Sequence, residues 1–84
     1  MVPKINCKLL TPDSRPLDKD LDMIVIPGVE GELGILSGHM PMIVALKKGQ
    51  IKAHLESAIM TYDILGGFAH ITKEGCNIIL DSEV

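Results

Sequence analysis

Apolar and polar residues alternate with a period of two along most of this chain, a pattern typical of β-strands that bury one face. The alternation runs through residues 5–10, 21–26, 51–56, 60–64 and 76–81, and a short apolar run occupies residues 42–46. Turn-forming residues separate these segments at 11–16, 47–50 and 73–75, and the 47–50 turn predicts a hairpin. Such spacing predicts an all-β domain, an antiparallel two-sheet β-sandwich or flattened barrel of roughly eight to ten short strands.

Residues 57–65 are the one stretch that also fits a helix, and the Gly66–Gly67 pair would end that helix early. Met60, Tyr62 and Ile64 alternate with polar residues. Because this alternation has the period of a strand, we expect a strand here.

Four apolar residues fall on strand faces that the alternation assigns to solvent: Leu10, Ile24, Ile26 and Ile79. Contiguous exposed apolar patches on small proteins often mark surfaces that bind a partner. Alternatively, bulges in the strands exchange the two faces and bury these side chains. The pattern supports both interpretations equally.

Residues 27–46 form a glycine-punctuated excursion between two apolar strands. Its glycines are Gly28, Gly31, Gly34 and Gly38. Each would cost a helix about 1 kcal/mol relative to alanine, so they suit turns and close backbone contacts instead. Glu30, Glu32 and His39 lie in the same segment. Polar residues on a loop between core strands are well placed to contact other molecules.

The composition indicates one small domain over residues 1–84 with an aliphatic core, since Phe and Tyr occur once each and Trp is absent. The net charge of −3 argues against a polyanionic partner, and the scarcity of aromatic residues argues against base stacking. We therefore expect no nucleic-acid partner. No apolar run approaches the roughly 18 residues of a membrane span, so any membrane contact is expected to pass through a partner.

Cys7 and Cys76 are the two cysteines, far apart in sequence and without Cys-x-x-Cys spacing. In a chain without secretory features we expect two buried, reduced thiols, and a disulfide between them stays open at this level.

The residues give little support for catalysis or metal binding. His39, His54 and His70 lie on separate segments without the spacing of metal ligands. Ser37 and His39 suggest a small hydrolase, but position 35 is Ile, so the Gly-x-Ser-x-Gly elbow is absent. A turn hydroxyl and a loop histidine bonded to backbone are the favoured interpretations.

The glycine spacing of residues 27–46 matches neither a Walker loop nor the dinucleotide fingerprint, and two glutamates would repel an anion. On an extended segment Glu30 and Glu32 would share a face, but this pattern fits a solvated loop as well as an acid/base pair. We expect no catalytic residue, no metal and no cofactor.

Several ordered motifs together resemble the epsilon subunit of the F-type rotary ATP synthase. They are Lys-Leu-Leu-Thr-Pro-Asp at 8–13, Gly-Val-Glu-Gly-Glu-Leu-Gly-Ile-Leu-Ser-Gly-His-Met-Pro at 28–41, Ala-Leu-Lys-Lys-Gly at 45–49, Tyr-Asp-Ile-Leu-Gly-Gly-Phe-Ala-His-Ile at 62–71 and Asn-Ile-Ile-Leu-Asp at 77–81. The resemblance covers essentially the whole chain.

The resemblance implies the N-terminal β-sandwich of a non-catalytic stalk subunit, which packs on the gamma subunit, contacts the polar loops of the c-ring and couples proton flow to ATP synthesis. By position, the candidates for the ring contact are Glu32, Leu36, Ser37, Gly38 and His39. For the gamma contact, the candidates are the outward apolar residues Leu10, Ile24, Ile26 and Ile79. A generic β-sandwich interaction module of another complex is the alternative function.

The chain departs from the family pattern at two loop positions and in its extent. Ser37 stands where the family usually has Pro, and Met40 stands where it has a small residue. The two-helix C-terminal domain of the family is absent from residues 1–84, so we expect no inhibitory hairpin or nucleotide site within them. The start at Met without a transit segment favours a bacterial protein, peripheral on the cytoplasmic face of the inner membrane through its partners, although a plastid-encoded protein would show the same start.

Overall fold

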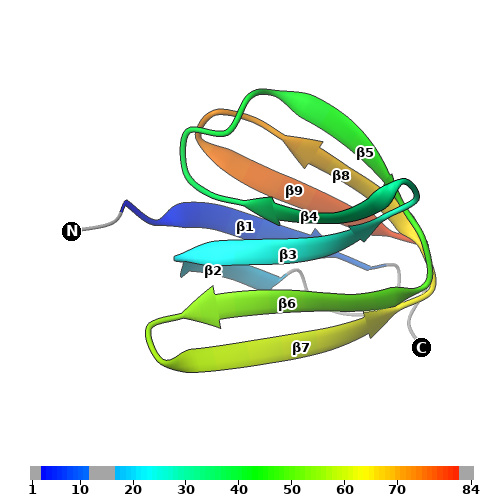
Figure 1. Cartoon of the computed structure of the whole chain (residues 1–84), viewed down its shortest axis with the longest axis horizontal. Helices are drawn as coiled ribbons and strands as arrows, with labels where there is room; N and C mark the ends of the chain where they lie inside the picture. Colours follow the sequence, from blue (N-terminus) through cyan, green and yellow to red (C-terminus); the bar gives the residue numbers. More distant parts are fainter. Residues whose placement is uncertain (1–2, 12–16, 82–84) are drawn as a thin grey trace.

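A computed structural model of the chain describes residues 3–11 and 17–81, and these residues form nine strands (Figure 1). The strands are β1 (Ile5–Leu10), β2 (Leu17–Leu21), β3 (Met23–Gly28), β4 (Gly31–Ile35), β5 (Met42–Leu46), β6 (Gly49–Leu55), β7 (Ala58–Ile64), β8 (Gly67–Ile71) and β9 (Gly75–Leu80). The all-β prediction is confirmed, as is the strand expected within residues 57–65. The expected turn at 11–16 lies mostly outside the described residues.

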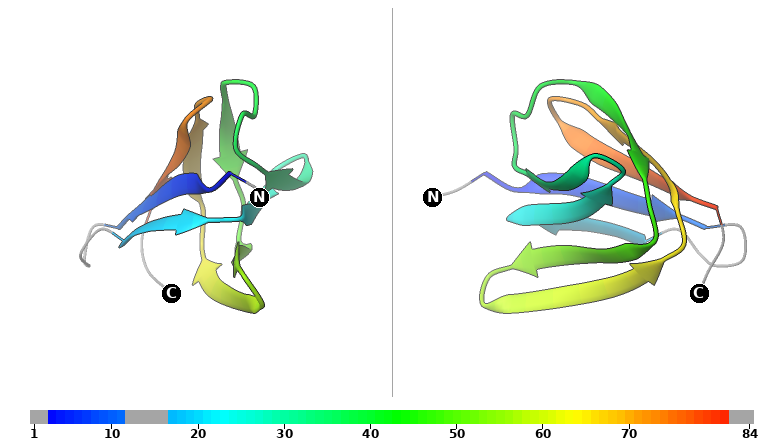
Figure 2. Two further views of the ribbon diagram at one scale, coloured as in Figure 1. Left: turned by 90° about the vertical axis from the view of Figure 1, so that its left-hand side faces the viewer. Right: turned by 45° about the vertical axis from the view of Figure 1, so that its right-hand side comes forward.

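The strands pair in the order β2-β1-β9-β8-β5-β3-β6-β7, and β4 pairs with β3. They form one curled sheet instead of the two sheets expected (Figures 1 and 2). Described pairs are antiparallel except β1 with β9, which run parallel with Cys7 opposite Cys76. The prediction of a fully antiparallel arrangement is wrong at this pair: β9, the last described strand, lies beside β1, the first, and runs in the same direction.

The curl comes from one long antiparallel ribbon, in which β5 and β6 form one strand and β7 and β8 form the other. Leu46 of β5 faces Gly67 of β8, and three residues further along, Gly49 of β6 faces Ile64 of β7 in the same register. The ribbon therefore bends without inserting a residue, and its halves lie on two sides of the core. The expected hairpin at 47–50 is wrong, since β5 pairs with β8 and β6 pairs with β7.

An aliphatic core fills the curl. Ile5, Ile51 and Ile78 are fully buried, and no polar side chain of the described residues is buried with them. Burial of a side chain of this size stabilises the fold by about 1.5–3 kcal/mol. The edges of the sheet approach each other around this core, with Lys19 Nζ of β2 only 3.9 Å from Met60 Sδ of β7.

Two of the four residues expected on the outer face belong to the core. Ile24 and Ile26 are fully buried, whereas Ile79 is 53% exposed and Leu10 is half-buried. The alternation shifts phase at Asp22, a bend between β2 and β3, so Leu21 and Ile24 both face inward although they are three residues apart. The outward assignment of Ile24 and Ile26 is therefore wrong.

The two cysteines are neighbours on β1 and β9. Both are free and buried, as expected. A hydrogen bond with Cys76, together with burial, raises the pKa of the Cys7 thiol above its ordinary value. A thiol with a raised pKa forms little thiolate and is a poor nucleophile. The pair fills the core between the only parallel strands described.

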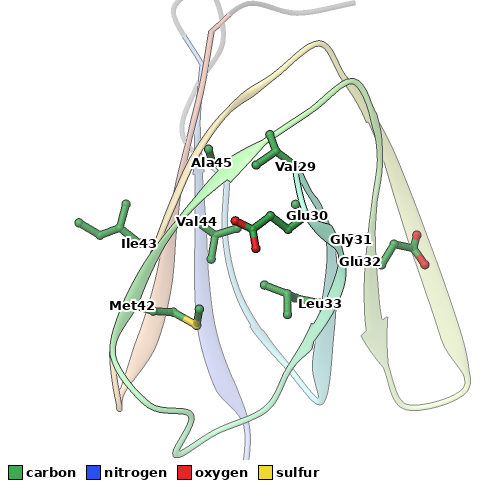
Figure 3. A pocket seen from close by; sticks show the side chains of 10 residues that line it. Val29, Glu30, Gly31, Glu32, Leu33, Met42, Ile43, Val44 and Ala45 are labelled. Carbon is green, nitrogen blue, oxygen red and sulfur yellow. The ribbon is translucent and has the colours of Figure 1, made fainter.

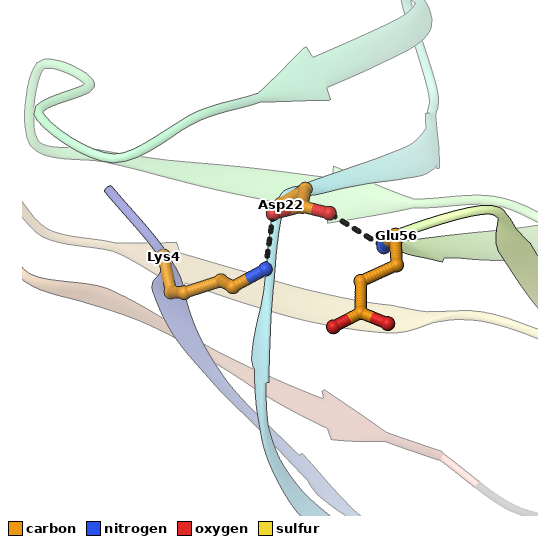
Figure 4. A network of polar contacts seen from close by, with 3 residues as sticks. All are labelled: Lys4, Asp22 and Glu56. Carbon is orange, nitrogen blue, oxygen red and sulfur yellow. Dashed lines mark hydrogen bonds and ion pairs between the residues drawn. The ribbon is translucent and has the colours of Figure 1, made fainter. Parts of the chain in front are cut away.

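A polar network ties the start of β1 to the β6–β7 turn (Figure 4). Lys4 Nζ lies 2.5 Å from Asp22 Oδ1, and the backbone N–H of Glu56 donates to Asp22 Oδ2 at 2.6 Å. Glu56 has a positive φ of 56°, which is uncommon for a residue with a side chain. Asp22 thus stabilises a turn whose conformation is unfavourable by itself.

Substitution of Gly67 by alanine is expected to destabilise the domain by at least about 3 kcal/mol. A Cβ at Gly67 would lie 2.2 Å from the carbonyl oxygen of Ile79, and the φ of +147° disfavours a side chain. Gly34→Ala is the control, since its added Cβ would meet only Met23 Sδ at an ordinary 3.6 Å. Urea unfolding measures both; equal stability of the two variants would contradict the close contact at Gly67.

Stability should depend on pH through Asp22. Hydrogen bonds from Lys4 and from the Glu56 backbone hold the pKa of the Asp22 carboxyl below its usual 3.8. A carboxyl with a depressed folded-state pKa stabilises the fold above its unfolded pKa, and this contribution is lost as the pH falls through the folded-state pKa. The Asp22→Asn variant should have a lower melting temperature than the wild type at pH 7. The difference between the two melting temperatures should narrow as the pH falls below 3.8.

Thermal melts at a series of pH values provide the measurement, with Lys4→Gln as the companion variant. Because the bond from Lys4 is the largest cause of the shift, Lys4→Gln should also flatten the pH dependence. A gap between wild type and Asp22→Asn that stays constant from pH 7 to pH 2.5 would show that the carboxylate charge contributes nothing.

Candidate interaction surfaces

The glycine-punctuated segment divides into a hairpin and a loop. Val29 and Glu30 form the two-residue turn that joins β3 to β4. A Cβ at Gly28 would lie 2.8 Å from the carbonyl oxygen of Gly31, and Gly31 has a φ of +135°. Only glycine fits such a close approach, which explains why this hairpin carries one at each side of its turn. Strand β4 was not anticipated, because its glycines hide the alternation.

The loop at residues 36–41 follows β4 and rests on the β8–β9 turn. The backbone N–H of Gly38 donates to the carbonyl of Lys73 at 3.2 Å, and the N–H of His39 donates to Leu36 at 3.2 Å. Gly38 has a φ of +86°, which glycine adopts easily. Leu36 is 50% exposed and Met40 is 78% exposed, so the loop presents apolar side chains to solvent.

The geometry of this loop gives no support to a Ser–His pair. His39 Nδ1 lies 2.9 Å from the backbone carbonyl of its neighbour Met40. Within the described part of the chain, no hydrogen bond joins Ser37 to His39. His39 is therefore a loop histidine bonded to backbone, as favoured from the sequence.

The candidates for the ring contact fall in two places. Leu36, Ser37, Gly38 and His39 are contiguous in the loop, but Glu32 lies near the other end of β4, next to the hairpin turn (Figure 1). The structure therefore does not gather all five into one small site.

Glu30 and Glu32 point in opposite directions. Figure 3 shows the Glu30 carboxylate inside the space between β4 and β5, and the Glu32 carboxylate outside it. The expectation that they share a face is wrong, because Glu30 lies in the turn and Glu32 in the strand. The two carboxylates thus belong to different surfaces.

A hollow of about 540 Å³ separates the β3–β4 hairpin from β5 (Figure 3). Its lining residues are Gly28, Val29, Glu30, Gly31, Glu32, Leu33, Met42, Ile43, Val44 and Ala45. This hollow could not be predicted from the sequence. It results from the divergence of β5 from the β3–β4 hairpin, which depends on how distant strands pair in the folded sheet.

An apolar patch crosses the outer face of β1, β9, β8 and β5. Leu10 faces Ile79, Ile79 faces Phe68 and Phe68 faces Ala45, so these four side chains form one cross-strand row. Ile43 extends the patch along β5. Phe68 is 56% exposed and Ile43 is 71% exposed. Sequence reasoning had found Leu10 and Ile79 but missed Phe68 and Ile43. Each of the two missed residues is the sequence neighbour of a buried residue, so alternation would have assigned it to the outer face.

Metal ligation has little basis in the arrangement of the histidines. His39 lies in the loop, His54 on β6 and His70 on β8. In residues 3–11 and 17–81 no three His, Cys, Asp or Glu side chains gather as a metal site would require. The same residues contain no helix with the length and apolarity that a membrane crossing needs.

Comparison with known proteins gives close relatives. The family model for the ATP synthase delta/epsilon chain, beta-sandwich domain, matches residues 4–84. The ATP synthase epsilon chain of Granulibacter bethesdensis is 43% identical over 75 residues, covering 88% of this chain and 56% of its own. The epsilon chain of Caulobacter vibrioides is 31% identical over 81 residues, covering 96% of this chain and 94% of its own.

Among solved structures, a chain in the Euglena gracilis mitochondrial ATP synthase (OSCP/F1/c-ring) has a TM-score of 0.85 and 28% identity, over 95% of this chain and 52% of that one. The chain thus spans little more than half the length of the Granulibacter and Euglena proteins. Since the family model covers nearly every residue, this chain belongs to the family of ATP synthase delta/epsilon chain beta-sandwich domains.

Proposed function

We propose that this chain is a non-catalytic subunit of the central stalk of a proton-translocating rotary ATP synthase. It packs on the gamma subunit, contacts the c-ring and helps to couple proton flow to ATP synthesis. The observation that carries the proposal is the family match over residues 4–84. The chain would sit peripherally at the cytoplasmic face of a bacterial inner membrane, held there by its partners.

The physical character of the domain suits this task. A curled sheet closed around an aliphatic core resists deformation, because protein interiors are densely packed. The charged side chains of the described residues lie outside the core, and apolar side chains are exposed both in the loop at residues 36–41 and on the outer face of β5 and β8. Transmission of torque needs a stiff body with two contact areas, and needs no chemistry of its own.

The ring side is proposed to include Glu32 and the loop from Leu36 to His39. Glu32 is exposed and points away from the hollow, so a basic group on a ring loop can reach it (Figure 3). Such a charge pair gives orientation and specificity more than affinity. In the loop, Leu36 is exposed while Ser37 and His39 are half-buried, so Leu36 is the larger contact.

The gamma side is proposed to be the patch of Leu10, Ile79, Phe68 and Ile43. Ile24 and Ile26 have no part in it, since they are buried in the core. Exposed apolar residues in one cross-strand row form a flat surface that loses little side-chain entropy on docking.

Binding of the gamma subunit should weaken when the patch becomes polar. Phe68→Asp is expected to lower the affinity for gamma about tenfold or more, because an aromatic side chain that docking would bury is replaced by a charge. Ile59→Asp is the control, since Ile59 is 59% exposed on β7, away from the patch. Isothermal titration of each variant with purified gamma measures the effect. If both variants lose the same affinity for gamma, the patch is not the gamma interface. If the wild-type chain binds neither gamma nor the c-ring, the proposed function is overturned.

Charge reversal at Glu32 should impair coupling. Glu32→Lys is expected to reduce ATP-driven proton pumping by about twofold or more in reconstituted enzyme, the size of one exposed ion pair. ATP hydrolysis measured in parallel separates lost coupling from lost assembly. Pumping equal to that of the wild type would indicate that Glu32 does not contact the ring, as expected for an unrelated interaction module.

A further inference from the structure

Cys7 and Cys76 lie side by side where the first two strands join the rest of the sheet. Cys7 of β1 is the register partner of Cys76 of β9, and both thiols are free and buried. Among the described strands, β2 pairs with β1 alone, and β1 pairs with β2 and β9. The β1–β9 pair is therefore the junction that attaches β1 and β2 to the sheet. A covalent bond between the cysteines would fasten this junction.

The spacing of the two strands allows a disulfide, although a strained one. Neighbouring strands lie about 4.8 Å apart, and disulfides join Cα atoms that are roughly 4.4–6.8 Å apart. Parallel register partners leave the sheet on the same side, so their Cβ atoms are also separated by about a strand spacing, whereas a relaxed disulfide prefers about 3.8 Å. The bond would draw the strands together, and a disulfide strained in this way is easily reduced.

The two thiols are already in contact in the reduced protein. A hydrogen bond between them raises the pKa of Cys7 and lowers the pKa of Cys76. Both side chains point into the core, since Cys7 is 1% exposed and Cys76 is 2% exposed. The sulfur atoms therefore need little movement to form a bond with each other.

We propose that Cys7 and Cys76 are a reversible redox site, oxidised to a disulfide by a small-molecule disulfide and reduced again by a small thiol. One cysteine thiolate attacks a sulfur of the small disulfide, so that a mixed disulfide forms, the small S–S bond breaks and one small thiolate leaves. The second cysteine loses its proton and attacks the sulfur of the first, and the second small thiolate leaves. Two protein thiols lose two electrons and two protons, and one small disulfide becomes two thiols.

Access to the buried thiols requires β1 to separate locally from β9. Local opening of part of a sheet needs less free energy than global unfolding. When β1 returns, the densely packed core disfavours a small thiol still attached to one cysteine, which favours its replacement by the other cysteine. The closed disulfide then holds β1 and β2 on the sheet. This inference goes beyond the stalk function and uses only residues of this chain.

Incubation of the purified full chain with oxidised glutathione, without denaturant, tests the proposal. Mass spectrometry of the intact chain should show the loss of two hydrogens, and a peptide digest should link Cys7 to Cys76. Dithiothreitol should reverse both changes. In urea, the unfolding equilibrium constant of the oxidised chain should be about tenfold or more lower than that of the reduced chain, because the crosslink restricts the unfolded chain.

Cys7→Ala and Cys76→Ala are the matched controls. Each retains one thiol, so oxidised glutathione should leave at most a mixed disulfide and should not lower the unfolding equilibrium constant. If either variant fails to fold, the wild-type measurements decide alone. The proposal is overturned if the wild-type chain stays reduced or carries glutathione without linking the two cysteines. It is also overturned if the linked chain unfolds as readily as the reduced chain. Because no partner enters this experiment, neither result bears on the proposed function.

Discussion

Close backbone contact at Gly67 lets one continuous ribbon serve both sides of the core. The β5–β6 strand and the β7–β8 strand keep one register through the bend, and Gly67 there lies too close to Ile79 for any side chain. The β5–β8 half then pairs with β9, while the β6–β7 half pairs with β3. Without this bend, the isoleucines of the two halves could not face each other across a shared interior. The rest of the sheet is built outward from that contact.

The surfaces that suit partner binding are products of the same curl. Where β5 leaves β3 to follow the bend, it diverges from the β3–β4 hairpin and opens the hollow that contains Glu30. On the other side of β5, the outer face carries Phe68 and Ile79 in one row. The hairpin and the loop at residues 36–41 occupy different ends of β4, so the domain offers contacts in several directions at once (Figure 1). This geometry fits a connecting element between larger bodies better than it fits a catalyst.

Much of the fold was predictable from alternation, and the failures have physical causes. Strands β1, β6 and β9 bury every second residue over most of their length, and β7 at least half-buries every second residue from Met60 to Ile64, so their pattern is visible. Strand β2 is exposed apart from its ends, and β4 is interrupted by glycine, so neither shows a period. The bend at Asp22 shifts the alternation in β3 by one residue. The sequence pattern therefore assigned Ile24 and Ile26 to the outer face, although both lie in the core. Which strand pairs with which, and hence the parallel β1–β9 pair, depends on contacts between distant residues. For the same reason the opposed directions of Glu30 and Glu32 could not be found from their spacing.

The position of β9 has a consequence for how this protein is made. It lies between β1 and β8, so the first described strand cannot reach the rest of the sheet until the last has left the ribosome. Pairing between such distant residues carries a large loop-closure cost and slows folding. During synthesis the nascent chain can form the bent ribbon early, but β1 and β2 must wait as an unattached hairpin. Closure of the domain therefore has to wait until β9 has emerged from the ribosome, and until then the aliphatic faces are open to chaperones.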